Sequence, residues 1–133
     1  MIDIENIVVN TVAEAVWGTY PNADVSSDYD PAPETMPTVF IYEASNTAYE
    51  QSFDDALKNH HVNVMYQVDV FALDKETAKA IRDIVDTAMQ GMKFTRTYSA
   101  PTLNIDRTIK RYTLRYEAIV GELIDNKYQM YRS

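Results

Sequence analysis

The chain has 133 residues, a common length for one domain, and its composition is that of an ordinary globular protein without cysteine. The missing cysteine excludes disulfides, thiol nucleophiles and thiolate metal sites, and no apolar run reaches membrane-spanning length. The net charge of −8 disfavours a protein that wraps nucleic acid, since such proteins need clustered positive charge. We therefore expect one soluble domain spanning residues 1–133, with no membrane contact, no specific nucleic acid and no cofactor.

The charge is unevenly distributed along the chain. Residues 1–60 contain eleven acids and one base, whereas residues 61–133 contain nine acids and eleven bases. Solvated faces of a monomer would explain this asymmetry. Self-association would explain it too, if the acidic half of one copy meets the basic strand of another. The sequence leaves both interpretations open.

Apolar residues at helical spacing predict a first helix near the start of the chain. Asp3 is its expected N-cap, and Gly18 followed by Pro21 is its expected end. The residues expected on its buried stripe are Ile4, Ile7, Val8, Thr11, Val12, Ala15 and Val16. A short strand is expected to follow within residues 22–27.

The next segment, DYDPAPETMP, carries three prolines between positions 31 and 37. Proline fixes φ and donates no hydrogen bond, which predicts an extended loop. The carboxylates of Asp28, Asp30 and Glu34 could suggest calcium, but the segment lacks the central glycine and the ligand spacing of a calcium loop. We expect no metal here.

Residues 38–44, TVFIYEA, are rich in β-branched and aromatic side chains and predict a second strand. Residues 45–59, SNTAYEQSFDDALKN, are polar and acidic without a clear period. A connection of this length inside a small domain is usually functional or flexible. We predict a mobile loop that becomes ordered only in an assembly.

The stretch NHHVNVMYQVDVFAL contains both histidines of the chain and then alternates strictly, with one parity apolar from Val62 to Ala72. This alternation predicts a long strand with one buried face. Neighbouring side chains on a strand point to opposite faces, so His60 and His61 cannot bind one metal ion together if both are extended. We expect a strand entry here rather than a metal or catalytic site.

A second helix is predicted after this strand. Asp74, with Thr77 three residues later, is the expected N-cap, and Gly91 is the expected C-cap. The expected buried stripe is Ala78, Ile81, Val85, Ala88, Met89 and Met92.

The remaining sequence returns to strand patterns, at residues 93–101 and 107–121 and in a short edge strand near the C-terminus. In the long strand the residues expected to face outward are Arg111, Thr113, Arg115 and Glu117, with the tyrosines between them facing inward. Arginines and tyrosines on opposite faces do not form an RNA-stacking surface.

Four stretches, taken in order, resemble the small tail-terminator and tail-completion (head–tail joining) proteins of long-tailed bacteriophages. They are MIDIENIVVNTVAEAV, MPTVFIYEASN, NHHVNVMYQVDVFA and GMKFTRTYSAPTLNIDRTIKRYTLRYEAIV. The resemblance is one of pattern and element order, and it spans nearly the whole chain. Beside it the sequence has no glycine-rich phosphate loop, no nucleophile elbow and no zinc-ligand spacing.

The resemblance implies an α+β fold, in which a mostly antiparallel β-sheet carries two main helices on one face. It implies a structural virion protein and not an enzyme: a ring, often hexameric, that caps the tail tube and joins it to the head. The implied partners are further copies of the chain, the tail tube protein and the head-side connector protein, in a virion made in the host bacterial cytoplasm. The alternatives are another neck or minor capsid protein, a small soluble enzyme or a nucleic-acid binding module.

In such a ring we predict that residues 45–59 reach a neighbouring subunit or the tail tube, and that basic residues of the strand over 108–120 receive them. The expected interface residues are Glu50, Asp54, Asp55, Arg111 and Arg115. One exposed ion pair contributes only about 0–1 kcal/mol. A ring repeats the contact at every interface, which multiplies a weak interaction.

Overall fold

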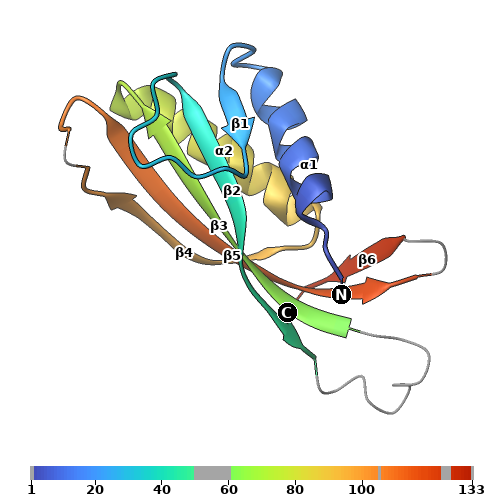
Figure 1. Cartoon of the computed structure of the whole chain (residues 1–133). Coiled ribbons are helices and arrows are strands. Elements are labelled where there is room, and N and C mark those ends of the chain that lie inside the picture. The colour runs from blue at the N-terminus through green and yellow to red at the C-terminus, as the bar shows by residue number, and fades with distance from the viewer. Residues whose placement is uncertain (1, 50–60, 105, 124–126, 133) are drawn as a thin grey trace.

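The fold is α+β, as expected. The computed structural model describes residues 2–49, 61–104, 106–123 and 127–132 (Figure 1). The elements in chain order are α1 (Glu5–Trp17), β1 (Asp24–Ser26), β2 (Thr38–Ala48), β3 (His61–Ala72), α2 (Lys75–Gly91), β4 (Thr95–Thr102), β5 (Lys110–Glu122) and β6 (Tyr128–Tyr131).

The strands form one sheet in the order β1-β2-β3-β5-β4, and β6 also pairs with β5. Among the strands of the described residues only β1 runs parallel to its neighbour; the other pairings are antiparallel. β4 pairs with the first half of β5 and β6 with the second half. The three long strands β2, β3 and β5 therefore make an elongated, twisted sheet that extends beyond the helices (Figure 1).

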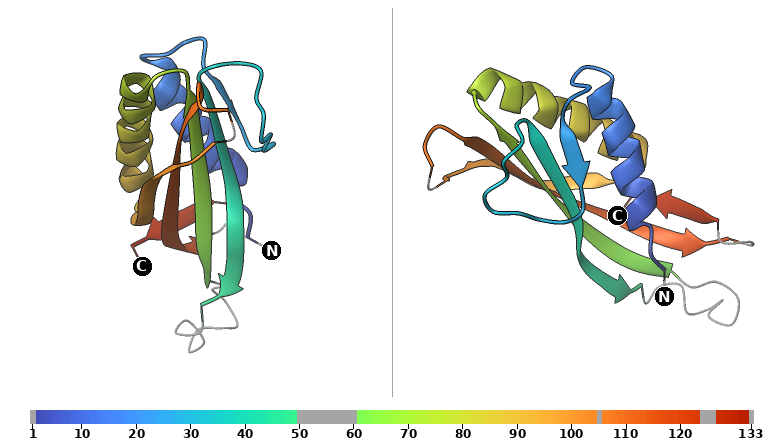
Figure 2. Two further views of the ribbon diagram at one scale, coloured as in Figure 1. Left: turned by 90° about the vertical axis from the view of Figure 1, so that its left-hand side faces the viewer. Right: turned by 45° about the horizontal axis from the view of Figure 1, so that its top comes forward.

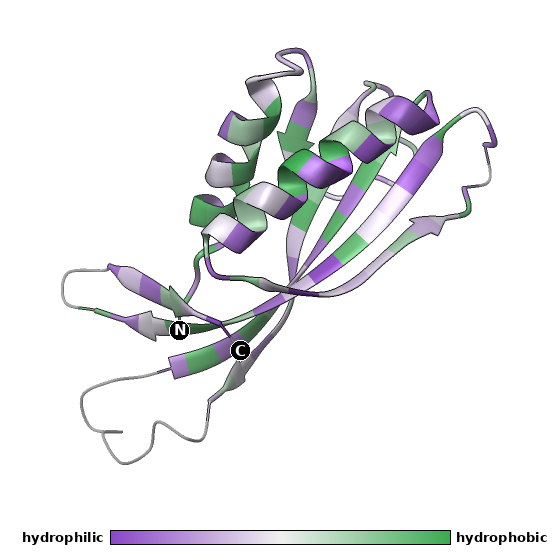
Figure 3. Ribbon diagram, turned by 180° about the vertical axis from the view of Figure 1, so that it is seen from behind, coloured by the Kyte–Doolittle hydropathy of each residue, from purple (hydrophilic) through white to green (hydrophobic). Residues whose placement is uncertain are grey.

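Both helices pack on one face of the sheet, as Figure 2 shows from two further directions. The strand residues expected to be buried beneath them all lie in the core: Val64, Tyr66, Val68, Val70, Leu114, Tyr116, Ala118 and Val120. Apolar and polar residues alternate along the strands beneath the helices (Figure 3). The period-two pattern thus assigned this face correctly, because neighbouring strand residues point to opposite sides.

The first helix differs from expectation at its start and on its stripe. Ile4 occupies the N-cap position, and Asp3 instead accepts a hydrogen bond from the backbone N–H of Glu5 at 3.0 Å. Ile7 is 41% exposed, although it shares the spacing of the buried stripe. The residues of α1 that are buried are Val8, Val12, Ala13 and Val16.

The second helix begins as predicted, because the carboxylate of Asp74 accepts a hydrogen bond from the backbone N–H of Thr77 at 3.0 Å. Its end was predicted wrongly. Gly91 is still helical, Met92 is the C-cap, and the residue with positive φ is Lys93, at 73°. Glycine is the usual residue in that conformation, so Gly91 led to a predicted helix end two positions before the residue that adopts it.

β2 is longer than the sequence suggested. It continues to Ala48 through a bulge between Glu43 and Ser45, so the first part of the predicted loop is strand. The side-chain amide of Asn46 donates to the backbone oxygen of Ile2 at 2.8 Å and to the Glu43 carboxylate at 3.0 Å. A polar side chain inside the strand thus ties β2 to the N-terminus, a contact that a periodicity argument does not reveal.

We expect Val68→Asp to prevent soluble folding, because Val68 is fully buried at the centre of β3 and the new charge would have no partner there. Thr97→Asp, at an exposed position of β4, is the matched control and should stay soluble. Soluble yield and circular dichroism measure both. A Val68→Asp protein as stable as the wild type would contradict the assignment of this face to the core.

Candidate functional site

The sheet face opposite the helices carries a buried polar cluster centred on Asp69 of β3. The side chain of Asp69 is fully buried. Its Oδ1 accepts hydrogen bonds from Nη2 of Arg111 at 2.9 Å, from Nε of the same residue at 3.2 Å and from Oγ1 of Thr113 at 2.8 Å. Its Oδ2 accepts from the Gln67 amide at 3.2 Å and from the Tyr42 hydroxyl at 3.4 Å. Both carboxylate oxygens are therefore occupied from within the chain.

Strand register brings this cluster together. Asp69 lies directly opposite Phe40 of β2 on one side and Thr113 of β5 on the other. Arg111 comes from the adjacent position of β5 on the same face, beside Phe71. Because side chains two residues apart share a face, a sheet in this register places all these groups over one patch.

The connection between β1 and β2 covers this patch. The ring of Tyr29 packs edge-on against Phe40, with 5.4 Å between centroids, and lies 5.8 Å from the guanidinium of Arg111. Figure 2 shows the connection on the opposite side of the sheet from α2. Arg111 and Thr113 do lie on the face opposite the helices, but the expectation that they face solvent was wrong. Arg111 is mostly covered and Thr113 is buried.

Burial also changes the acidity of Tyr42 at the edge of this cluster. Its removal from water raises the pKa of the Tyr42 hydroxyl, and the neighbouring carboxylate of Asp69 raises it further. The hydroxyl therefore stays protonated and serves as a donor to the carboxylate. A carboxylate that is buried and saturated with donors stabilises the sheet and offers no free oxygen to a substrate.

Further along the same face the side chains are more open to solvent. Arg115 is exposed; its Nε donates to the Gln67 amide oxygen at 3.2 Å, and its guanidinium lies over the Tyr98 ring at 5.2 Å from the centroid. Arg115 thus faces outward as predicted and keeps donors free for a partner, unlike Arg111.

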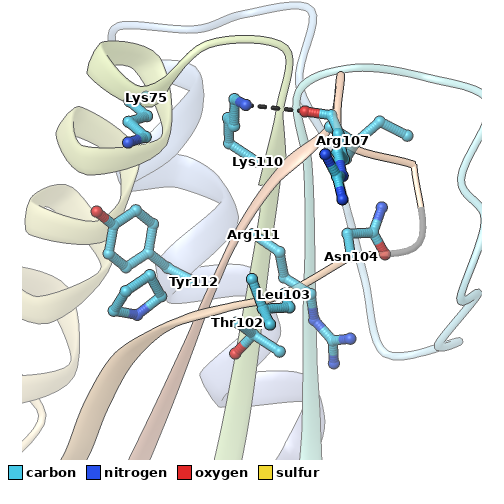
Figure 4. A pocket seen from close by; sticks show the side chains of 10 residues that line it. Lys75, Thr102, Leu103, Asn104, Arg107, Lys110, Arg111 and Tyr112 are labelled. Atoms are coloured by element: carbon cyan, nitrogen blue, oxygen red, sulfur yellow. Dashed lines mark hydrogen bonds between the residues drawn. The ribbon is translucent and has the colours of Figure 1, made fainter.

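A pocket of about 450 Å³ lies between the start of α2 and the connection from β4 to β5 (Figure 4). Its apolar lining includes Leu103, Ile109 and Tyr112. Lys75, Arg107 and Lys110 also line it, and no acid does so among the described residues. The volume lies in the range of ligand-sized pockets. The combination of cations with apolar walls suits an anionic group attached to an apolar one.

The histidine at the start of β3 behaves as a strand-entry residue. The ring of His61 lies 6.0 Å from that of Tyr131 on β6, and it fills the space beside Gly121, where an added Cβ would come within 2.7 Å of Nε2. His60 lies outside the described residues. Within the described ranges, no three histidine, aspartate or glutamate side chains are grouped as metal ligands would be.

The predicted interface residues are only partly placed by the structure. Glu50, Asp54 and Asp55 lie outside the described residues. Arg111 and Arg115 share one face, but Arg111 is bound to Asp69. Sequence reasoning missed the Asp69 cluster and the basic pocket. An acid inside the apolar run VDVFA was the available signal for the first; the second gathers residues from separate elements and leaves no local pattern.

Comparisons with known proteins add no family. No protein-family model matches the chain, and no curated protein is found to be similar to it. Among the helices of the described residues, none has both the length and the apolar character needed to cross a membrane.

We expect Asp69→Asn to lower the free energy of unfolding by about 3–5 kcal/mol, because it leaves the mostly buried Arg111 without its counter-charge. Arg111→Met should also destabilise, and the double variant should lose less than the sum of the two. The exposed Arg115→Met is the control and should change stability by no more than about 0.5 kcal/mol. Urea unfolding measures all four. Additive losses would mean that the pair is not coupled.

The purified protein should hold no stoichiometric zinc, because no three potential ligands among the described residues are grouped as a metal site needs, and adjacent side chains of an extended segment would point to opposite faces. His60→Ala combined with His61→Ala should leave the far-ultraviolet circular dichroism spectrum unchanged. Elemental analysis after dialysis tests the first expectation. One equivalent of retained metal would contradict it.

Proposed function

We propose that this protein is a structural component of a bacteriophage tail, a tail-terminator or tail-completion protein that caps the tail tube as a ring and joins it to the head-side connector. The observation that carries this proposal is the element order. The helix, proline-rich connection, long strands and second helix occur in the order for which the sequence resembles that family. The α+β sheet with both helices on one face is the architecture that the resemblance implies.

The chemistry of the described residues is consistent with a structural role. The most buried acid, Asp69, binds donors of its own chain. Asp86 accepts from the Tyr116 hydroxyl at 2.8 Å and pairs with Arg96 at 3.0 Å, which joins α2 to the sheet. These polar groups are used to hold elements together, and a ring subunit needs such rigidity to present the same surface at every interface.

A ring is tested directly by the mass of the purified protein. Size-exclusion chromatography with light scattering should give a closed oligomer, and negative-stain electron microscopy should show rings. Tubes assembled from a phage tail tube protein should bind the rings at one end. A protein that is monomeric at all concentrations, and that binds no tube, would refute the proposal.

The contact predicted for the acidic segment can be tested separately. Asp54→Lys with Asp55→Lys should leave circular dichroism unchanged but weaken ring formation or tail capping, because the reversed charges would meet the basic strand of a neighbour. Added salt should weaken assembly of the wild type, since exposed pairs are screened. Light scattering across a salt series measures both effects. Assembly that ignores the reversal and the salt would remove the electrostatic part of the proposal.

A further inference from the structure

Three cations at the pocket beside the β4–β5 connection have no acidic partner among the described residues. Lys75 and Arg107 are exposed, and Lys110 bonds only to the backbone oxygen of Arg107, at 2.8 Å. The nearby carboxylate of Asp106 is turned to the backbone N–H and the hydroxyl of Thr108, at 2.9 and 2.6 Å. The exposed Leu103 stands next to these charges. This basic pocket is an uncompensated positive surface on an acidic protein.

An uncompensated negative surface lies elsewhere, where the start of α1 crosses β2. Asp3, Glu5 and Glu43 form this acidic triad, and none of them forms an ion pair with a described residue. The backbone N–H of Glu43 donates to the Glu5 carboxylate at 3.4 Å, so the residues are close together. Burial raises the pKa of Glu43, and the charges of Asp3 and Glu5 raise it further. The exposed Ile7 follows one turn later on α1.

A buried donor beside the triad also lacks a partner within the described part of the chain. Tyr66 lies directly across from Glu43 in the strand pairing, and its buried hydroxyl has no hydrogen-bond partner among those residues. Burial raises the pKa of Tyr66, and the carboxylates of the triad add to this effect. The triad therefore concentrates negative charge at a place where its own chain supplies no cation from the described residues.

The two surfaces are too far apart to neutralise each other within one copy. Glu43 aligns through Tyr66 with Tyr116 of β5, whereas Lys110, the cation of the basic pocket on β5, lies six residues away. Six strand residues span about 20 Å, which exceeds the screening length of about 8 Å at physiological salt. The surfaces also lie on opposite sides of β3, because the sheet order is β1-β2-β3-β5-β4, with the acidic triad at β2 and the basic pocket at β5 and β4.

We propose that the basic pocket of one copy binds the acidic triad of a second copy, Asp3, Glu5 and Glu43, in a head-to-tail contact. Each side offers charge of one sign next to an exposed aliphatic residue, Leu103 on one and Ile7 on the other. Such a contact joins unlike surfaces and leaves one of each free at the ends of a pair. It therefore repeats, and it forms a ring where the rotation between neighbouring copies closes. The inference rests on the proposed ring and names its interface. In this interface the cations of the basic pocket take the role predicted for Arg111, which is already paired with Asp69.

Charge exchange between two full-length variants tests the contact. One variant carries Arg107→Glu and Lys110→Glu, and the other carries Asp3→Lys and Glu5→Lys. Each alone should raise the subunit concentration needed for half-assembly by at least about tenfold, because like charges then face each other. An equimolar mixture should recover the wild-type mass, since every interface in an alternating ring pairs opposite charges again.

The control variant carries Lys79→Glu and Glu14→Lys, two exposed positions outside both surfaces, and should assemble as the wild type does. Circular dichroism and urea unfolding confirm that each variant is folded. Light scattering gives the mass. A double-stranded DNA fragment and inorganic phosphate, each titrated into the wild type and the Arg107→Glu/Lys110→Glu variant, test the other anions that could occupy the pocket.

Recovery of the wild-type oligomer in the mixture supports the head-to-tail contact. The inference is overturned if folded variants assemble normally on their own, if the mixture stays dissociated, or if it stops at a dimer. It is also overturned if Arg107→Glu/Lys110→Glu abolishes binding of DNA or phosphate while assembly is unchanged. Wild-type rings with any of these results leave the proposed function standing, whereas a wild-type protein that never assembles and binds no tube refutes both.

Discussion

The buried charge of Asp69 is the constraint on which the arrangement of the sheet depends. An ionised carboxylate without water must be matched by donors, and here the donors come from all three long strands. A slip of one residue in β3 would turn Asp69 towards the apolar layer under the helices. The cluster with Arg111 therefore favours the observed register of β3, and the ring of Tyr29, from the connection between β1 and β2, lies beside the Arg111 guanidinium of the pair.

The features that the sequence predicted depend on interactions between residues close together in the chain. The features that it did not predict depend on contacts between residues far apart in the chain. Strand and helix periods are local, so the faces of β3 and β5 and the cap at Asp74 could be predicted from neighbouring residues. Whether the second face of the sheet is open depends on Tyr29, which lies forty residues before Asp69 in the chain. No period reports such a contact. The prediction of where α2 ends failed for a local reason, because Lys93, and not Gly91, adopts the positive-φ conformation that follows the helix.

The candidate surfaces show the same limit more sharply. The uneven charge of the two halves was visible in the sequence, but the sequence could not separate cations that are paired inside the subunit from those that are free to bind. Arg111 forms an ion pair with Asp69, whereas Arg107, four residues earlier, is exposed at the pocket. The two arginines carry the same charge but differ in burial. The number of bases in the sequence therefore does not show which of them are available to a partner.

The position of the two uncompensated surfaces also bears on symmetry. In a two-fold dimer both surfaces would have to lie on one interface, because the two copies contact each other through the same patch. Here the acidic triad lies at β2 and the basic pocket at β4 and β5, on opposite sides of the central strand β3. If each copy presents its acidic triad to one neighbour and its basic pocket to another, any open row of subunits has an unmatched surface at each end. A head-to-tail contact of this kind forms a closed ring where the rotation between neighbouring copies closes, and a ring would leave neither surface unmatched.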